Sequence, residues 1–412
     1  MVGHGGMVRA VAISPDGRHV LTGSFDYTAR LWDFVEQRQV GELNEHFGPV
    51  NTVTFLPDGR RALTGGDDGV AILWSLDDLR PAARLEGHTQ KVSATAVSAD
   101  GRLAATGSWD GTVRLWNLAD GRQVQVLNNH SPVNSVAFAG GSGRLISGDH
   151  EGVLRIWDVA SGEAQPPLIG HLMAITQIAV SPDGNRALTA GIDKSVRLWD
   201  LAGRRQLRKM NHHEGQVFSV AFSPDGSHAL SAGRFGKVIQ WDLNNGRLST
   251  LIEAHDAMIW AVAYTPDGRF ALSASSDEMV RVWHLASGDR IGIEVEEPLE
   301  PPPWLTSNHP GARMYRKCAR CHALSIEERQ RSGPHFNSLF GRRVGSVAGF
   351  KYTEPLRKAD FVWSEKTLGE LFREGPDNVL PGTKMPMQSI PDERQLAALI
   401  DYLRELTKPP GD

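Results

Sequence analysis

The sequence predicts a multidomain protein, an all-β ring of seven repeats followed by a small all-α domain. Three observations carry this prediction. Tryptophans recur every 41 or 42 residues in the first three quarters of the chain, a proline-rich stretch follows, and a CxxCH motif then opens a helical pattern. A chain of 412 residues exceeds one ordinary core, and its 22% charged and 40% hydrophobic residues are typical of a globular protein.

The repeats are defined by the tryptophans Trp32, Trp74, Trp116, Trp157, Trp199, Trp241 and Trp283. A histidine precedes each by 28 residues, or by 27 in the fourth repeat: His4, His46, His88, His130, His171, His213 and His255. Ten positions before each tryptophan is a hydroxyl residue: Thr22, Thr64, Thr106, Ser147, Thr189, Ser231 and Ser273. Six positions before it, the series reads Asp26, Asp68, Asp110, Glu151, Asp193, Phe235 and Asp277. Because the set recurs in every repeat, we expect a structural hydrogen-bond network rather than catalytic triads.

Turn signals separate the β-rich segments of each repeat. Asp-Gly turns of the SPDG kind favour hairpins and occur at 14–17, 56–59, 98–101, 181–184, 223–226 and 265–268. With Gly87-His88 and the Trp-Asp pairs at 32–33, 157–158, 199–200 and 241–242, the repeats resemble the WD40 family. The resemblance implies a seven-bladed β-propeller over residues 1–297. We expect each blade to be built from contiguous chain. Because Phe235 replaces the acid of the sixth blade, we expect that blade to be the loosest or to be altered for a purpose.

A change of composition follows the repeats. Residues 298–307 are proline-rich and predict a semi-rigid linker. From Leu305 onward the chain has 17 Lys+Arg against 13 Asp+Glu, a net charge of +4, whereas the part before it has 27 against 35, a net charge of −8. We therefore expect an acidic ring joined to a basic domain at 308–412, an asymmetry that affects docking rather than fold.

The only two cysteines of the chain stand in the motif Cys318-Ala-Arg-Cys321-His322. CxxC alone predicts a redox dithiol, CxxC with a second pair predicts zinc, and CxxCH predicts a c-type haem. No second pair exists for a tetrahedral zinc site. A haem also needs a second axial ligand, and Met385 in the sequence PGTKM offers a soft thioether downstream.

Ordered motifs connect these two ligands and continue to an amphipathic helix: GPHFNSLFGRRVG at 333–345, GFKYTEP at 349–355, FVWSEKTL at 361–368 and ERQLAALIDYLREL at 393–406. Together they resemble the class I cytochromes c of the mitochondrial type over residues 308–408. The resemblance implies one covalent haem c, attached through Cys318 and Cys321, whose iron is bound by His322 and Met385.

The resemblance also implies supporting roles. The carbonyl of Pro334 would accept a hydrogen bond from the imidazole of His322 and orient it. The haem propionates would be held by Arg342, Tyr352 and Trp363, with Thr383 beside them. The first helix, at Gly311 and Tyr315, would contact the last helix around Leu399 and Tyr402.

Some residues depart from the pattern or compete with it. Leu371 stands where the family has a tyrosine that bonds the methionine sulfur, and the loop before Met385 is one residue longer. Met387 is an alternative ligand that the PGTKM register disfavours. His309 and His335 are interpreted as loop or surface residues.

The predicted function is one-electron transfer, with the propeller as a docking scaffold for a redox partner protein. Two iron positions filled by the protein leave no open site for a substrate, so we expect a carrier and not an enzyme. The alternatives are a propeller-borne, quinohaemoprotein-like dehydrogenase and a haem-based redox sensor. Candidate contact residues are Phe25, Trp109, His150, Ile192, Phe218 and Trp260 on the propeller, and Lys317, Arg320, Arg342, Lys351 and Lys384 near the haem edge.

The location is predicted from chemistry, because bacteria attach haem to CxxCH outside the cytoplasmic membrane. We therefore expect a periplasmic protein, although no signal peptide is visible, and hence a mature, truncated or wrongly started sequence. No apolar run is long enough to span a membrane. We expect a monomer with no nucleic-acid partner.

Overall fold

A computed structural model describes residues 1–292, 307–319, 321–326, 333–350, 352–380, 383, 385 and 389–407, without the side chains of Lys317 and Asp377. The chain divides into two compact units, Met1–Ile293 and Glu294–Asp412. The predicted linker at 298–307 lies outside the described residues except for Ser307. In the described part of the chain, no helix has the length and apolar character needed to cross a bilayer.

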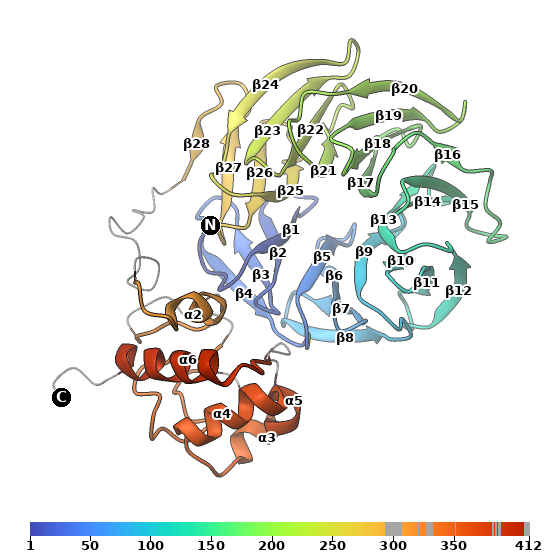
Figure 1. Ribbon diagram of the computed structural model, residues 1–412. Helices are drawn as coiled ribbons and strands as arrows, with labels where there is room; N and C mark the ends of the chain where they lie inside the picture. The colour runs from blue at the N-terminus through green and yellow to red at the C-terminus, as the bar shows by residue number, and fades with distance from the viewer. Residues whose placement is uncertain are drawn as a thin grey trace. The chain divides into compact units, whose positions relative to one another are not determined.

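Unit 1 is a ring of seven four-stranded antiparallel sheets, the blades of a propeller (Figure 1). The first four blades have these strands: β1 (Val8–Ile13), β2 (His19–Ser24), β3 (Ala29–Asp33) and β4 (Gln39–Leu43); β5 (Val50–Phe55), β6 (Arg61–Gly66), β7 (Ala71–Ser75) and β8 (Arg80–Leu85); β9 (Val92–Val97), β10 (Leu103–Ser108), β11 (Thr112–Asn117) and β12 (Gln123–Asn128); β13 (Val133–Ala139), β14 (Arg144–Asp149), β15 (Val153–Asp158) and β16 (Leu168–Ile169).

The last three blades repeat the same order: β17 (Ile175–Val180), β18 (Arg186–Gly191), β19 (Val196–Asp200) and β20 (Arg205–Met210); β21 (Val217–Phe222), β22 (His228–Gly233), β23 (Lys237–Asp242) and β24 (Arg247–Glu253); β25 (Ile259–Tyr264), β26 (Phe270–Ser275), β27 (Val280–His284) and β28 (Arg290–Ile291). The second strand of every blade is almost fully buried, because neighbouring blades pack against both of its faces. The seven-bladed fold predicted from the repeat is therefore confirmed.

The seventh blade departs from the expectation of blades built only from contiguous chain. Its outer strand β28 has two residues, and the edge of β27 is continued by the start of the chain. Met1 exchanges both backbone hydrogen bonds with Val280, and Val2 forms a bridge with Met279. Met1 precedes Trp32 by 31 residues, as Leu43 precedes Trp74, so it fills the apolar position that each blade needs at this edge. This pairing joins the first and last blades.

The repeated residues form the predicted network. In five blades the histidine Nδ1 lies 2.6–2.9 Å from an aspartate oxygen. Its Nε2 lies 2.6–2.7 Å from the hydroxyl, which accepts a further bond from the tryptophan indole. Because a carboxylate can only accept, Nδ1 carries the hydrogen, and each link of the chain has a defined donor. All of these polar groups are thus satisfied inside the blade.

The fourth blade corrects the sequence interpretation. His130 is exposed, with a φ of +65°, and Glu151 is also exposed. Asn129 takes the histidine's place: its Oδ1 accepts from Ser147 at 2.7 Å, and its Nδ2 donates to Asp149 at 3.3 Å. The carboxylate of Asp149 is fully buried and also pairs with Arg155. The prediction was wrong because an exposed histidine stands one residue from the network position, which lies 28 residues before Trp157 as in the other blades.

Unit 2 is a small helical unit. Its helices are α2 (Ala312–Cys318), α3 (Glu354–Lys358), α4 (Glu365–Glu374), α5 (Pro376–Val379) and α6 (Glu393–Leu406). Ser364 and Thr367 cap the start of α4 reciprocally, and Asp392 caps α6. One apolar cluster gathers residues from α2, α4 and α6 and from the loops between them, including Cys318, Leu371 and Met385. The all-α class predicted for this part is confirmed.

The corrected network gives a first prediction. Asp149→Ala would leave Arg155 and Asn129 without their buried acceptor, at a cost of about 3 kcal/mol in unfolding free energy. Glu151→Ala removes an exposed side chain and should change it by less than about 0.5 kcal/mol. Denaturant unfolding followed by tryptophan fluorescence measures both. Equal losses in the two variants would contradict the assignment.

Candidate functional site

The CxxCH motif lies at the end of the first helix of unit 2. Helix α2 ends at Cys318, whose carbonyl accepts from the backbone N–H groups of Cys321 at 3.0 Å and His322 at 2.9 Å. This extra turn brings both sulfur atoms and the imidazole onto one short segment. Cys318 is buried in the apolar cluster, whereas Cys321 is half-buried.

The imidazole of His322 is held from two sides. Its Nδ1 lies 2.7 Å from the carbonyl oxygen of Pro334, so Nδ1 donates and the lone pair of the neutral ring is on Nε2. The ring of Phe336 stacks on it at a centroid distance of 4.3 Å. A Cβ on Gly333 would lie 2.4–2.8 Å from three ring atoms, so only glycine permits this approach. This is the orientation and tautomer that a metal-binding histidine needs.

The thioether of the proposed second ligand belongs to the same cluster. Met385 is half-buried and packs against the core that contains Cys318, although 67 positions separate them in the sequence. Its backbone N–H donates to Thr383 Oγ1 at 3.1 Å, and Thr383 N–H donates to the carbonyl of Leu380 at 3.0 Å. Thr383 therefore fixes the turn that carries Met385. The alternative ligand Met387 lies outside the described residues.

The three predicted propionate donors lie near one another. Arg342 and Trp363 are linked through the backbone, since Trp363 N–H donates to the carbonyl of Arg342 at 2.9 Å. Burial raises the pKa of Tyr352, and the nearby guanidinium of Arg342 opposes that shift. Arg342 donates to the carbonyls of Asn337 at 2.6 Å and His335 at 2.7 Å, which anchors it in the loop that follows Pro334. Burial lowers the pKa of Arg342.

Helices α2 and α6 cross closely beside this site. A Cβ on Gly311 would lie 2.2 Å from the carbonyl oxygen of Ala398 and 2.6 Å from the Cβ of Tyr402. The rings of Tyr315 and Tyr402 meet edge to face at 5.9 Å. These contacts hold the first and last helices together and so fix the position of Cys318 at the end of α2.

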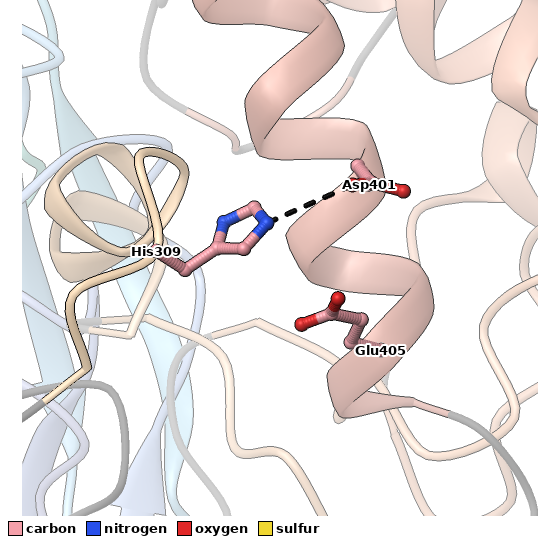
Figure 2. A group of neighbouring side chains, drawn as sticks. All are labelled: His309, Asp401 and Glu405. Carbon is pink, nitrogen blue, oxygen red and sulfur yellow. Dashed lines mark ion pairs between the residues drawn. The ribbon is translucent and has the colours of Figure 1, made fainter.

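His309 was interpreted from the sequence as a loop or surface residue, but it has a structural role. Its ring stacks on Tyr402 at 4.9 Å, its Nδ1 accepts from Gly311 N–H at 3.0 Å, and its Nε2 lies 3.6 Å from Asp401. Glu405 lies one helical turn beyond Asp401, and the three groups resemble a metal site (Figure 2). Because Nδ1 accepts, the neutral ring carries its hydrogen on Nε2 and donates towards Asp401. His309 therefore connects the start of α2 to α6. No sequence motif indicated this role.

Four of the six propeller residues that were predicted as contacts pair with neighbouring blades. Phe218 and Trp260 stack at 4.4 Å, and the guanidinium of Arg9 lies 4.2 Å from the ring of Trp260. Trp109 meets His150 edge to face at 5.8 Å. Lys91 Nζ lies 3.4 Å from the ring of Trp109. These aromatic groups are thus partly engaged within the ring.

The donor set of unit 2 fits a c-type haem. Within the described residues, Cys318 and the thioether of Met385 belong to one apolar cluster, and the oriented imidazole of His322 stacks on Phe336, which packs against that cluster; Cys321 lies on the same turn as His322. Vinyl groups react with thiols, and imidazole and thioether are the axial ligands typical of low-spin electron-transfer haems. When bound, such a group supplies a one-electron couple, while the chain supplies orientation and an apolar environment.

Comparisons with known proteins agree with this geometry. A family described as "WD domain, G-beta repeat" matches residues 1–33, 37–75, 79–117, 121–158, 163–200, 204–242 and 246–284, and the family "Cytochrome c" matches 309–407. A cytochrome c of Arabidopsis thaliana is 38% identical over 99 residues, 24% of this chain and 88% of the relative. Cytochrome c of Cochliobolus lunatus is 37% identical over 99 residues, 24% and 91% of the two chains. Cytochrome c2 of Blastochloris viridis is 32% identical over 95 residues, 23% and 74% of the two chains.

The fold and the site together define a propeller protein with an appended haem electron-transfer domain. The chain belongs to the WD40 repeat family and, over residues 309–407, to the cytochrome c family. The second family implies a haem c cofactor, and propellers of the first commonly mediate protein interactions.

The helix crossing gives a second prediction. Gly311→Ala should destabilise unit 2 by about 1–3 kcal/mol or more, because the new methyl group meets backbone atoms of α6. Gly369→Ala in α4 is the control: its new Cβ meets the mobile end of Arg373, and the helix gains up to about 1 kcal/mol. Thermal unfolding followed by helical circular dichroism measures both. If Gly311→Ala left the thermal stability of unit 2 unchanged, α2 and α6 would not need to approach each other this closely.

Proposed function

We propose that the protein is a one-electron carrier with a single covalent haem c. Cys318 and Cys321 form the thioethers, and His322 and Met385 bind the iron. The observation that carries the proposal is the hydrogen bond between His322 Nδ1 and the carbonyl of Pro334, because it sets the ring in the ligand tautomer. Arg342, Tyr352 and Trp363 hold the propionates, with Thr383 beside them.

A carrier, rather than an enzyme, fits these ligands. The imidazole and the thioether would together hold the iron and leave no open position for a substrate, so the group would supply a one-electron couple. The chemistry of the reaction then lies in the partner protein, and the role of this chain is to position the haem for transfer.

The propeller serves as the docking scaffold. The loops and turns that carry the histidine–aspartate network in blades two, five and six present the exposed apolar side chains Phe47, Leu172, Met173 and Phe235. Four large apolar groups exposed at 52–83% on one kind of loop favour a protein contact.

Of the predicted cations at the haem edge, Arg342 donates hydrogen bonds to loop carbonyls. Arg320, Lys351, Lys384 and the side chain of Lys317 lie outside the described residues.

The proposed location is the periplasm. Covalent attachment of haem to CxxCH in bacteria takes place outside the cytoplasmic membrane, and the relatives include a bacterial cytochrome c2. Fractionation of the native host, with the haem-stained chain followed in each fraction, tests the location. Haem-stained protein in the cytoplasm would contradict it.

Substitution of the two methionines tests the ligand assignment. Met385→Leu should abolish the iron–sulfur charge-transfer band of the oxidised protein. It should also lower the reduction potential by a few tenths of a volt, within the roughly 0.8 V that axial ligands span. Met387→Leu is the control and should leave both unchanged. A lost band in the Met387 variant alone would transfer the ligand role to that residue.

The carrier assignment is tested without a partner protein. The oxidised protein, mixed with alcohols or sugars, should stay oxidised, whereas ascorbate should reduce it at once. Sustained turnover with a small substrate would show a catalytic centre in the propeller.

A further inference from the structure

The sixth blade has lost one member of its network while keeping the groups that bind it. In the other five complete networks, the aspartate accepts from the histidine Nδ1 and from a backbone N–H two residues beyond itself. In four of them it also accepts from the N–H that follows the histidine. Three such donors thus converge on the carboxylate in four blades, and two in the fifth.

Blade six retains the corresponding donors but has no carboxylate between them. His213 Nε2 lies 2.6 Å from Ser231 Oγ, which also accepts from Trp241, so the ring has the same orientation as in the other blades. By their positions in the repeat, its Nδ1, the N–H of Glu214 and the N–H of Lys237 correspond to the three donors of the other blades. Phe235 offers no acceptor, and its side chain is 54% exposed, with the ring over Gly215.

A cavity of about 30 Å³ lies at this point, lined by His213, Glu214, Arg234, Phe235 and Lys237 among others. It exceeds the roughly 10–15 Å³ that one water molecule requires. The side chain of Glu214 is 75% exposed and 3.9 Å from Lys237 Nζ, so it points to solvent. Lys237 Nζ is also 3.3 Å from the exposed Glu253. The cavity therefore has donors on its walls and two cationic side chains at its border.

A further substitution agrees with this interpretation. Position 239 is isoleucine, where five blades have an arginine, and four of those arginines lie within 4 Å of a network aspartate: Arg30, Arg155, Arg197 and Arg281. Blade six thus lacks both the acid and its inner cation. Positive charge comes instead from Arg234 and Lys237, which are nearer to solvent.

We propose that this cavity is a carboxylate-binding site, and that the carboxylate comes from an aspartate or glutamate side chain of a docking protein. An inserted carboxylate would accept hydrogen bonds from His213 Nδ1 and from the backbone N–H groups of Glu214 and Lys237, as the missing aspartate would. The exposed Phe235 of this blade, with Leu172 and Met173 on the loop of blade five, suits apolar residues flanking the acid. The source of the carboxylate rests on the docking role proposed above, whereas the site itself does not.

The titration of His213 supports the proposal. Burial, with a smaller contribution from His212, lowers its pKa from 6.5 to about 4. Between pH 6.5 and 4, His213 is therefore protonated in the unfolded chain but not in the native state. The free energy of unfolding falls as the pH drops through that range. The other charged side chains that line the cavity are Arg234, Lys237 and Glu214, which lie nearer to solvent than the ring of His213. A bound carboxylate would reverse the shift.

The site is tested with sodium acetate on the full-length protein. At equal ionic strength, acetate but not chloride should raise the melting temperature of the propeller by a few degrees, growing with the logarithm of concentration. Phe235→Asp supplies the carboxylate from within, so it should melt higher without acetate and gain nothing from it. Phe235→Asn, equal in size but uncharged, should still respond. An acetate response equal in all three proteins would overturn the site.

A second readout does not depend on the folding of a variant. Imidazole NMR, with the His213 signal identified by its loss in His213→Gln, should show a higher pKa in acetate than in chloride. An unchanged pKa would overturn the proposal.

The source of the carboxylate is tested with a peptide that carries one aspartate between apolar residues. It should stabilise the propeller at lower concentration than acetate does, and the matching asparagine peptide should not. If the peptide stabilised the propeller less than acetate does, the carboxylate would not come from a protein, although the carboxylate-binding site itself would stand. The haem function can be measured separately in the same samples.

Discussion

An imidazole fixed through Nδ1 is the constraint on which both units depend. In five blades an aspartate accepts from Nδ1, which turns Nε2 towards the hydroxyl that the tryptophan also contacts. In unit 2 the carbonyl of Pro334 accepts from Nδ1 of His322. A hydrogen bond at Nδ1 thus has a different consequence in each unit. In the propeller it satisfies buried polar groups, and in the helical unit it leaves Nε2 with the lone pair that the proposed iron site uses.

The exceptions to this rule are informative. His309 reverses it, because its Nδ1 accepts from Gly311, and the ring acts as a pin between α2 and α6 rather than a ligand. In the fourth blade Asn129 replaces the imidazole, and the carboxylate that accepts from it belongs to Asp149. His213 keeps the ring but lacks the acceptor. The acceptor at Nδ1 therefore decides what each ring can do.

The sequence predicted the fold well because each blade repeats one pattern about 42 residues long, and seven copies leave little ambiguity. From the resemblance to the cytochromes c we also expected the carbonyl of Pro334 beside His322, and it lies 2.7 Å from Nδ1 of that ring. The sequence interpretation failed where one residue of register decides a contact. His130 stands next to the network position held by Asn129, and the pairing of Met1 with Val280 joins opposite ends of the repeat region. The role of His309 depends on a helix crossing made possible by Gly311, which no local pattern encodes.

The central claim is that Cys318 and Cys321 hold one haem covalently. The most direct measurement is the intact mass of the denatured chain, produced in a cell that carries out c-type haem attachment. We expect a single species heavier than the polypeptide by the mass of one haem, and the mass of the bare polypeptide when both cysteines are changed to alanine. A wild-type chain that releases its haem on denaturation and shows the bare mass would contradict it.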